Sequence, residues 1–75
     1  MKEYLQFISI NSEIRFGKPC ITGTRITVGD ILGWLASDMT EQEILEDYPS
    51  LKKEHIKAAL AFAANRETVI KIVAG

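Results

Sequence analysis

A change in the spacing of apolar residues at Thr27 divides the sequence and limits the folds open to it. Before Thr27, residues 4–10 are rich in aromatic and β-branched side chains, which favours a strand. After Thr27, apolar residues recur every three or four positions, as in amphipathic helices that pack on a common core. The change predicts a mainly α fold that follows a short β-rich region.

The β-rich region, residues 1–26, must supply a pairing partner for residues 4–10, because a lone strand is not stable. Residues 14–16 and 20–22 flank a Gly17-Lys18-Pro19 turn, so they are candidates for a small hairpin. A strand of a second subunit is the other candidate. The residues alone leave open whether the first strand pairs within the chain or between chains.

The first of three predicted helices spans residues 28–37 and opens the helical part, residues 27–65. Thr27 is a suitable N-cap, and Asp30 places a negative charge in the first turn, where it suits the helix dipole. Trp34 lies off the apolar stripe of this helix. We interpret it as a second packing surface or a subunit contact.

The second and third predicted helices are joined by a tight turn. The second spans residues 41–47, begins at a capping box formed by Thr40 and Glu43, and ends before Pro49, which has no N–H. The third spans residues 53–65 and is apolar almost all round, which indicates burial on two sides. Its predicted core side carries Ile56, Ala59, Leu60 and Ala63. The pair has the outline of a helix-turn-helix.

The 75 residues leave room for one small domain. A chain of this size buries about 60% of its unfolded surface, so we expect a homodimer to complete the core. The net charge of -1 argues against a protein that coats nucleic acid by bulk electrostatics. Residues 66–75 are either a C-terminal tail or an extension of the third helix, because their β-branched side chains leave both open.

The single cysteine and single histidine exclude several kinds of site. Cys20 forms no internal disulfide, and Cys20 with His55 is too small a set for a zinc site in one chain. No catalytic triad is readable. The start, MKEYLQFISI, is too short and polar for a signal peptide, and no apolar run approaches the about 18 residues of a membrane helix. We expect a cytoplasmic protein without cofactor, metal, membrane segment or enzymatic activity.

A basic cluster stands at the start of the third predicted helix. It comprises Lys52, Lys53, Glu54, His55 and Lys57. In helix-turn-helix proteins this helix enters the major groove, so lysines there would neutralise phosphates and His55 or Glu54 would reach base edges. The alternative is a solvated face, which is favoured by the unfavourable interaction of lysines with a helix N-terminus.

The helix before this cluster is acidic. It carries Asp38, Glu41, Glu43, Glu46 and Asp47 at or near its ends. These carboxylates would repel a phosphate backbone. They form either a solvated outer face or a surface that docks a basic partner protein.

Residues 17–26 form a glycine-containing segment with two cations. Gly17 and Gly23 permit backbone conformations that other residues resist, and Lys18 and Arg25 place positive charge near them. Such a loop can hold a nucleotide phosphate or contact the DNA backbone. The alternative is a structured turn in which Arg25 bonds backbone carbonyls or a carboxylate such as that of Asp30.

Three blocks of the sequence resemble one protein family. Residues 17–28 match the pattern GKP-x-I-x-GTRI-x-V, residues 39–51 resemble a block that ends in DYP-x-L, and residues 56–63 match I-x-AAL-x-(Y/F)A. These blocks are similar to those of the domain-of-unknown-function family four hundred and thirty-three. The chain departs from the family at Lys52 and Lys53, where a Thr-Pro pair usually caps the helix.

The resemblance implies a homeodomain-like three-helix bundle with a helix-turn-helix, often dimeric. Family members are similar to VapB-type antitoxins, encoded beside a PIN-like toxin nuclease. By this resemblance the protein would bind operator DNA and the toxin. Candidate toxin contacts are the acidic helix or the apolar C-terminal residues Val69, Ile70, Ile72 and Val73, and the off-stripe Trp34 is a further candidate partner contact. The alternative is a protein-only interaction module that binds no DNA.

Overall fold

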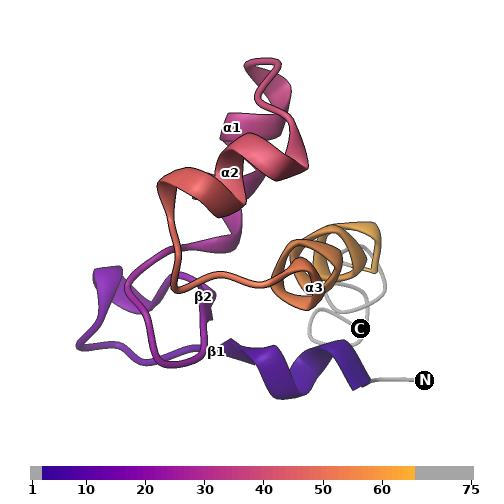
Figure 1. The fold of residues 1–75 in the computed structure, drawn as a ribbon. Helices are drawn as coiled ribbons and strands as arrows, with labels where there is room; N and C mark the ends of the chain where they lie inside the picture. The colour runs from indigo at the N-terminus through magenta and orange to yellow at the C-terminus, as the bar shows by residue number, and fades with distance from the viewer. Residues whose placement is uncertain (1–2, 66–75) are drawn as a thin grey trace.

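The computed structural model describes residues 3–65, which form three α-helices and a two-stranded antiparallel sheet (Figure 1). In chain order the elements are the 3-10 helix η1 (Glu3–Phe7), β1 (Ile8–Ser9), the short turn η2 (Arg15–Gly17), β2 (Cys20–Ile21), α1 (Val28–Ala36), α2 (Glu41–Asp47) and α3 (Lys53–Ala64). The mainly helical class with a small β region is confirmed.

The predicted strand over residues 4–10 is wrong for most of its length. Glu3–Phe7 is a 3-10 helix, and only Ile8–Ser9 is extended. In a 3-10 turn, side chains three residues apart lie on the same side, and Tyr4 and Phe7 are both half-buried toward α3. Burial of these two rings on a neighbouring helix overrides the β preference of the local composition.

The short strand β1 pairs within the chain. Ile8 lies opposite Ile21, and Ser9 lies opposite Cys20. The predicted hairpin between residues 14–16 and 20–22 is therefore wrong. Residues 15 and 16 have φ angles of 50° and 60°, which a β-strand cannot accommodate.

Both α1 and α2 begin at reciprocal caps. The Thr27 hydroxyl accepts the Asp30 N–H at 2.8 Å, while the Asp30 carboxylate accepts the Thr27 N–H at 3.1 Å. Thr40 and Glu43 repeat the arrangement, at 3.1 and 2.8 Å. The structure confirms the predicted N-cap at Thr27 and the predicted capping box at Thr40. Asp30 forms a second capping box with Thr27 at the start of α1.

Helix α3 is covered on two sides by its own chain. It packs against α1 and α2 on one side and against η1 on the other (Figure 1). Ile56 and Ala59 are buried in the core, and the buried Ala58 borders the η1 side. The almost all-round apolar surface of α3 predicted burial on two sides, and other segments of the same chain cover both sides. Leu60, predicted on the core side, is 47% exposed, which corrects that assignment.

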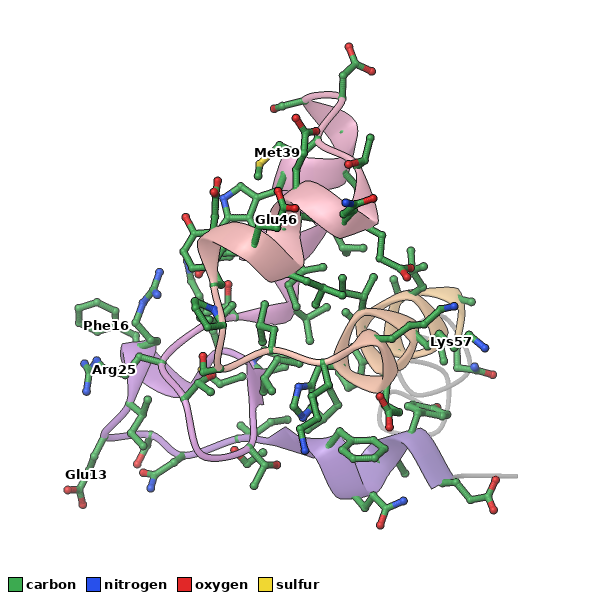
Figure 2. The ribbon with its side chains drawn as sticks, viewed as in Figure 1. Glu13, Phe16, Arg25, Met39, Glu46 and Lys57 are labelled. Carbon is green, nitrogen blue, oxygen red and sulfur yellow. The ribbon has the colours of Figure 1, made fainter. Side chains whose placement is uncertain are left out.

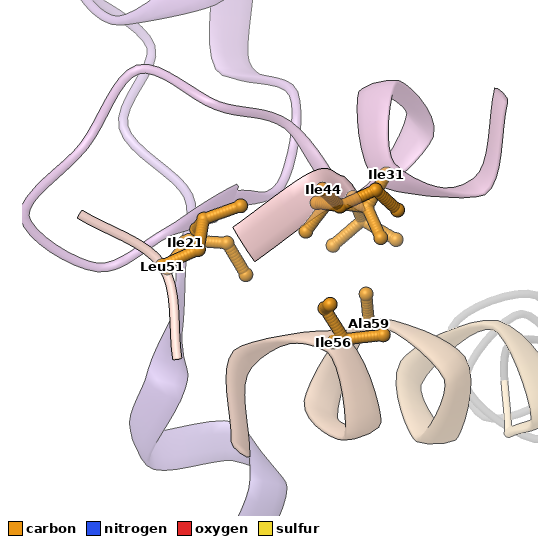
Figure 3. Packing of buried hydrophobic residues seen from close by; sticks show 7 residues of the cluster. Ile21, Ile31, Ile44, Leu51, Ile56 and Ala59 are labelled. Atoms are coloured by element: carbon orange, nitrogen blue, oxygen red, sulfur yellow. The ribbon is translucent and has the colours of Figure 1, made fainter. Parts of the chain in front are cut away.

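The core joins all the main elements. Its buried members are Ile21, Val28, Ile31, Ile44, Leu51, Ile56 and Ala59 (Figure 3). They come from β2, the three helices and the turn before α3. Beside this cluster, the Trp34 ring stacks on Tyr48 with centroids 4.2 Å apart and planes 10° apart. Trp34 therefore serves as a second packing surface, between α1 and the end of α2.

We expect Ile31→Ala to lower the free energy of unfolding by about 3 kcal/mol, because it removes a fully buried side chain and leaves a cavity in the core. The matched control is Ile10→Ala, which makes the same change at a side chain that is 64% exposed and should cost less than about 0.5 kcal/mol. Urea denaturation measures both. Equal losses in the two variants would contradict this core assignment.

Candidate functional site

An exposed face of α3 carries two of the predicted DNA-binding lysines. Lys53, Lys57, Leu60 and Ala64 are all exposed, and their spacing of four, three and four residues places them on one side of the helix. This α3 face lies between the core side and the η1 side, and Lys57 extends from it into solvent (Figure 2). Lys52, just before the helix, is exposed as well.

The start of α3 is capped by His55. Its Nδ1 accepts the Lys52 N–H at 2.9 Å, and its ring meets Phe7 edge-on with centroids 5.4 Å apart. His55 thus occupies the place in the cap that Glu43 occupies in α2. This role was not predicted, although His55 stands three residues after the N-cap position, as Glu43 does. The cap uses Nδ1 of His55, which leaves Nε2 as the ring atom for the predicted base-edge role.

The acidic residues lie on the helix next to the α3 face. Helix α2 packs against α3, and most of the carboxylates at or near its ends are exposed. The exposed ones are Asp38, Glu43, Glu46 and Asp47. The acidic and basic clusters of the sequence are therefore carried on adjacent helices.

Arg15 ties η2 to the start of α1. Its Nη1 donates to the Arg25 carbonyl oxygen at 2.8 Å and to Oδ2 of Asp30 at 3.2 Å. Arg25 was the residue predicted for this bond to Asp30, and that assignment is wrong. The fold of η2 brings Arg15 back to α1, whereas the Arg25 side chain is exposed. Arg15 and Asp30, which are 15 residues apart in the sequence, thus meet only in the tertiary structure.

The carboxylate of Asp30 is stabilised in its charged form. Burial alone would raise the pKa of Asp30, but hydrogen bonds with Thr27 and the positive charge of Arg15 outweigh burial and lower it. Asp30 therefore joins the cap of α1 to the η2 turn through a group that stays ionised at neutral pH.

The η2 turn is left-handed. Arg15, Phe16 and Gly17 have consecutive φ angles of 50°, 60° and 79°, a conformation that costs about 1–2 kcal/mol for each residue other than glycine. The Phe16 side chain is 94% exposed, and Lys18 and Arg25 are exposed too. Phe16 and Arg25 lie toward the same edge of the molecule in Figure 2, where the Arg15 side chain joins the two segments through the Arg25 carbonyl oxygen. We name Phe16, Lys18 and Arg25 the η2 tip.

The loop after β2 closes on itself. The Thr24 hydroxyl donates to the Ile21 carbonyl at 2.9 Å and accepts the Ile26 N–H at 3.0 Å, while the Thr24 N–H bonds the same Ile21 carbonyl. These amides are used inside the turn and do not face outward to hold a phosphate. The loop is thus a structured turn, and Arg15 rather than Arg25 fixes it through the Arg25 carbonyl oxygen.

The predicted DNA-binding residues fall into two separate groups. Lys57 lies on the opposite side of the molecule from Arg25 and Phe16 (Figure 2), and Lys18 directly follows η2. The η2 tip thus does not extend the α3 face within one chain. The predicted partner contacts Val69, Ile70, Ile72 and Val73 lie outside the described residues, and Trp34 is half-buried against Tyr48.

In the described part of the chain, no three His, Cys, Asp or Glu side chains gather closely enough to hold a metal ion. No helix within residues 3–65 combines the length and the apolar character needed to cross a bilayer.

The family model described as "Protein of unknown function (DUF433)" matches residues 8–63. The chain belongs to the DUF433 family. The match runs from β1 into α3, so it includes the Arg15–Asp30 pair and both capping boxes.

Among solved structures, the chain is similar to a DUF433 member protein from Anabaena variabilis ATCC 29413. The TM-score is 0.74 and the sequence identity is 27%, over 97% of this chain and 77% of the other. Comparison with curated proteins gives no match. The family model thus establishes the family, and the similar solved structure has the same fold.

We expect Asp30→Asn to lower the free energy of unfolding at neutral pH by about 1 kcal/mol, because it weakens the α1 cap and the bond to Arg15. The pKa of Asp30 is lowered on folding, so its stabilising charge is present above the ordinary value of 3.8 and is lost as the pH falls through the lower folded-state value. The stability difference between wild type and variant should therefore shrink as the pH falls from about 5 to about 2.

Chemical denaturation across this pH range measures the Asp30 effect. The matched control is Asp47→Asn, the same change at an exposed carboxylate on α2. A difference that stays constant with pH, or that the control reproduces, would contradict the role assigned to Asp30.

We expect Phe16→Asn to raise the free energy of unfolding by about 1 kcal/mol, because asparagine tolerates the left-handed conformation and the exposed ring loses little burial. Phe16→Ala is the matched control, since alanine removes the ring but keeps the backbone cost, and it should match wild type. Thermal denaturation at low protein concentration measures both. A loss of stability in Phe16→Asn would contradict the strained turn.

Proposed function

We propose that this DUF433 chain is an antitoxin-like DNA-binding module in which α2 and α3 act as a homeodomain-like helix-turn-helix. The supporting observation is the α3 face, where Lys53 and Lys57 stand exposed on a helix held rigidly from both sides. A rigid helix with free lysines on one side suits approach to a DNA groove.

Phosphate contacts would position the module on DNA. Lys52, Lys53 and Lys57 are exposed, and none of them is in an ion pair within the described residues. Each phosphate they neutralise releases a counterion and steepens the salt dependence of binding. Glu54 is exposed in the first turn of α3 and is the candidate for accepting a hydrogen bond from cytosine. His55 would position the helix through its cap.

Toxin neutralisation forms the second half of the proposal. It is supported by the resemblance to VapB-type antitoxins, which accompany PIN-like toxin nucleases, and by the apolar composition of residues 69–73. Binding of the complex to its own operator would let the protein regulate its operon. We expect these events in the cytoplasm, with a homodimer as the DNA-binding form.

A protein-only interaction module is the second candidate. One observation favours it: the exposed carboxylates of α2 lie on the helix next to the α3 face, and like charge repels phosphate. Under this candidate the acidic helix docks a basic partner, and the α3 lysines are only solvated.

Binding to the protein's own promoter fragment at several salt concentrations distinguishes the two candidates. We expect Lys53→Gln and Lys57→Gln each to weaken binding and to flatten the slope of log K against log salt by about 0.9. The cause is the loss of one phosphate contact.

The matched control for this experiment is Gln42→Glu. It changes the net charge by the same amount at an exposed position of α2. The control should keep the wild-type slope. Wild-type protein that does not bind the fragment, or lysine variants that keep the full slope, would exclude the DNA-binding role of the α3 face and leave the protein-only module.

A further inference from the structure

The η2 tip has the form of a preorganised anchor. A phenylalanine that is 94% exposed stands on three consecutive left-handed residues, with Lys18 and Arg25 exposed beside it. Arg15 holds the turn through the Arg25 carbonyl and Asp30, at 2.8 and 3.2 Å. A ring fixed in advance loses little conformational freedom when it is buried by a partner, which is typical of aromatic anchors in interfaces.

A groove on the same molecule has complementary chemistry. It lies between η1 and α3 and has a volume of about 340 Å³. Its lining residues are Glu3, Tyr4, Phe7, Glu54, Lys57, Ala58 and Ala61. The small Ala58 and Ala61 and the rings of Tyr4 and Phe7 make it mostly apolar. Two carboxylates against one ammonium group give it a negative charge.

We propose that the η1–α3 groove binds the η2 tip of a second copy of this chain. Phe16 of one copy would enter the apolar groove of the other, where Ala58 and Ala61 leave room for a ring. Arg25 and Lys18 would then face Glu3 and Glu54. A cationic rim around an apolar knob and an anionic rim around an apolar groove are complementary both in shape and in charge.

The shape of the molecule favours two such contacts at once. The chain measures 40 × 25 × 23 Å, with η2 toward one end of the view and η1 with α3 toward the other (Figures 1 and 2). Two copies side by side in antiparallel orientation bring each tip next to the other copy's groove. Such an arrangement closes as a two-fold dimer, which is the commonest symmetry of soluble oligomers. The contact forms without DNA, although the groove shares Glu54 and Lys57 with the proposed DNA-binding residues.

Sedimentation equilibrium of the full chain, without DNA, tests the contact. We expect wild type to approach twice its mass of 8.4 kDa as concentration rises. Phe16→Ala and Phe16→Asn should each raise the dimer dissociation constant at least tenfold. Since Phe16→Asn is expected to stabilise the fold, its loss of dimer cannot be ascribed to unfolding.

Charge reversal identifies the two surfaces. Arg25→Glu and Glu54→Lys should each weaken the dimer at least tenfold, and the chain with both changes should regain most of the lost affinity because the ion pair is restored in reverse. Glu46→Lys makes the same charge change at an exposed site on α2 and should leave the dimer intact.

Three results would overturn the contact. They are a wild-type chain that stays monomeric at high concentration, a dimer that survives both Phe16 variants, and a double charge reversal that is no tighter than the single ones. The first would leave the groove free for another protein. The second and third would place the dimer interface elsewhere on the chain.

Discussion

Burial of α3 on two sides is the constraint on which the other features depend. The core residues Ile56 and Ala59 hold α3 to α1 and α2, and η1 covers its other side next to Ala58. A narrow face is left, and Lys53 and Lys57 occupy it. The same packing creates the η1–α3 groove, because a 3-10 helix resting on alanines leaves space between its rings. The DNA proposal and the dimer proposal thus use adjoining sides of one helix and share Glu54 and Lys57.

The Arg15–Asp30 pair also holds two segments together, the η2 turn and the start of α1. Asp30 caps α1 and accepts a hydrogen bond from Arg15, so the start of a helix and a strained turn are held by one carboxylate. The pair is partly exposed, and ion pairs of this kind contribute little to stability by themselves. Its importance lies in geometry, since it fixes a left-handed turn that presents Phe16 to solvent.

The helices were predictable because their signals are local. Thr40 and Glu43 form a capping box within four residues, and Pro49 ends α2 because it lacks an N–H. The N-terminal region was not predictable in the same way. Residues 4–10 have a β-like composition, but Tyr4 and Phe7 are placed by α3, which lies about fifty residues further along the chain. The Arg15 contact was missed for the same reason, since the η2 turn aims its side chain and nothing nearby in sequence shows this.

By itself, the sequence determined the three helices, the caps of α1 and α2, the two charge clusters and the family resemblance that the DUF433 match bears out. These features depend on residues within a turn or two of one another. Only the tertiary structure decided that β1 pairs with β2, that Arg15 reaches Asp30, and that Arg25 and Lys57 lie on opposite sides. Each of these outcomes depends on contacts between distant segments. Such contacts form where burial and hydrogen bonding are best for the whole chain, and local preference does not encode them.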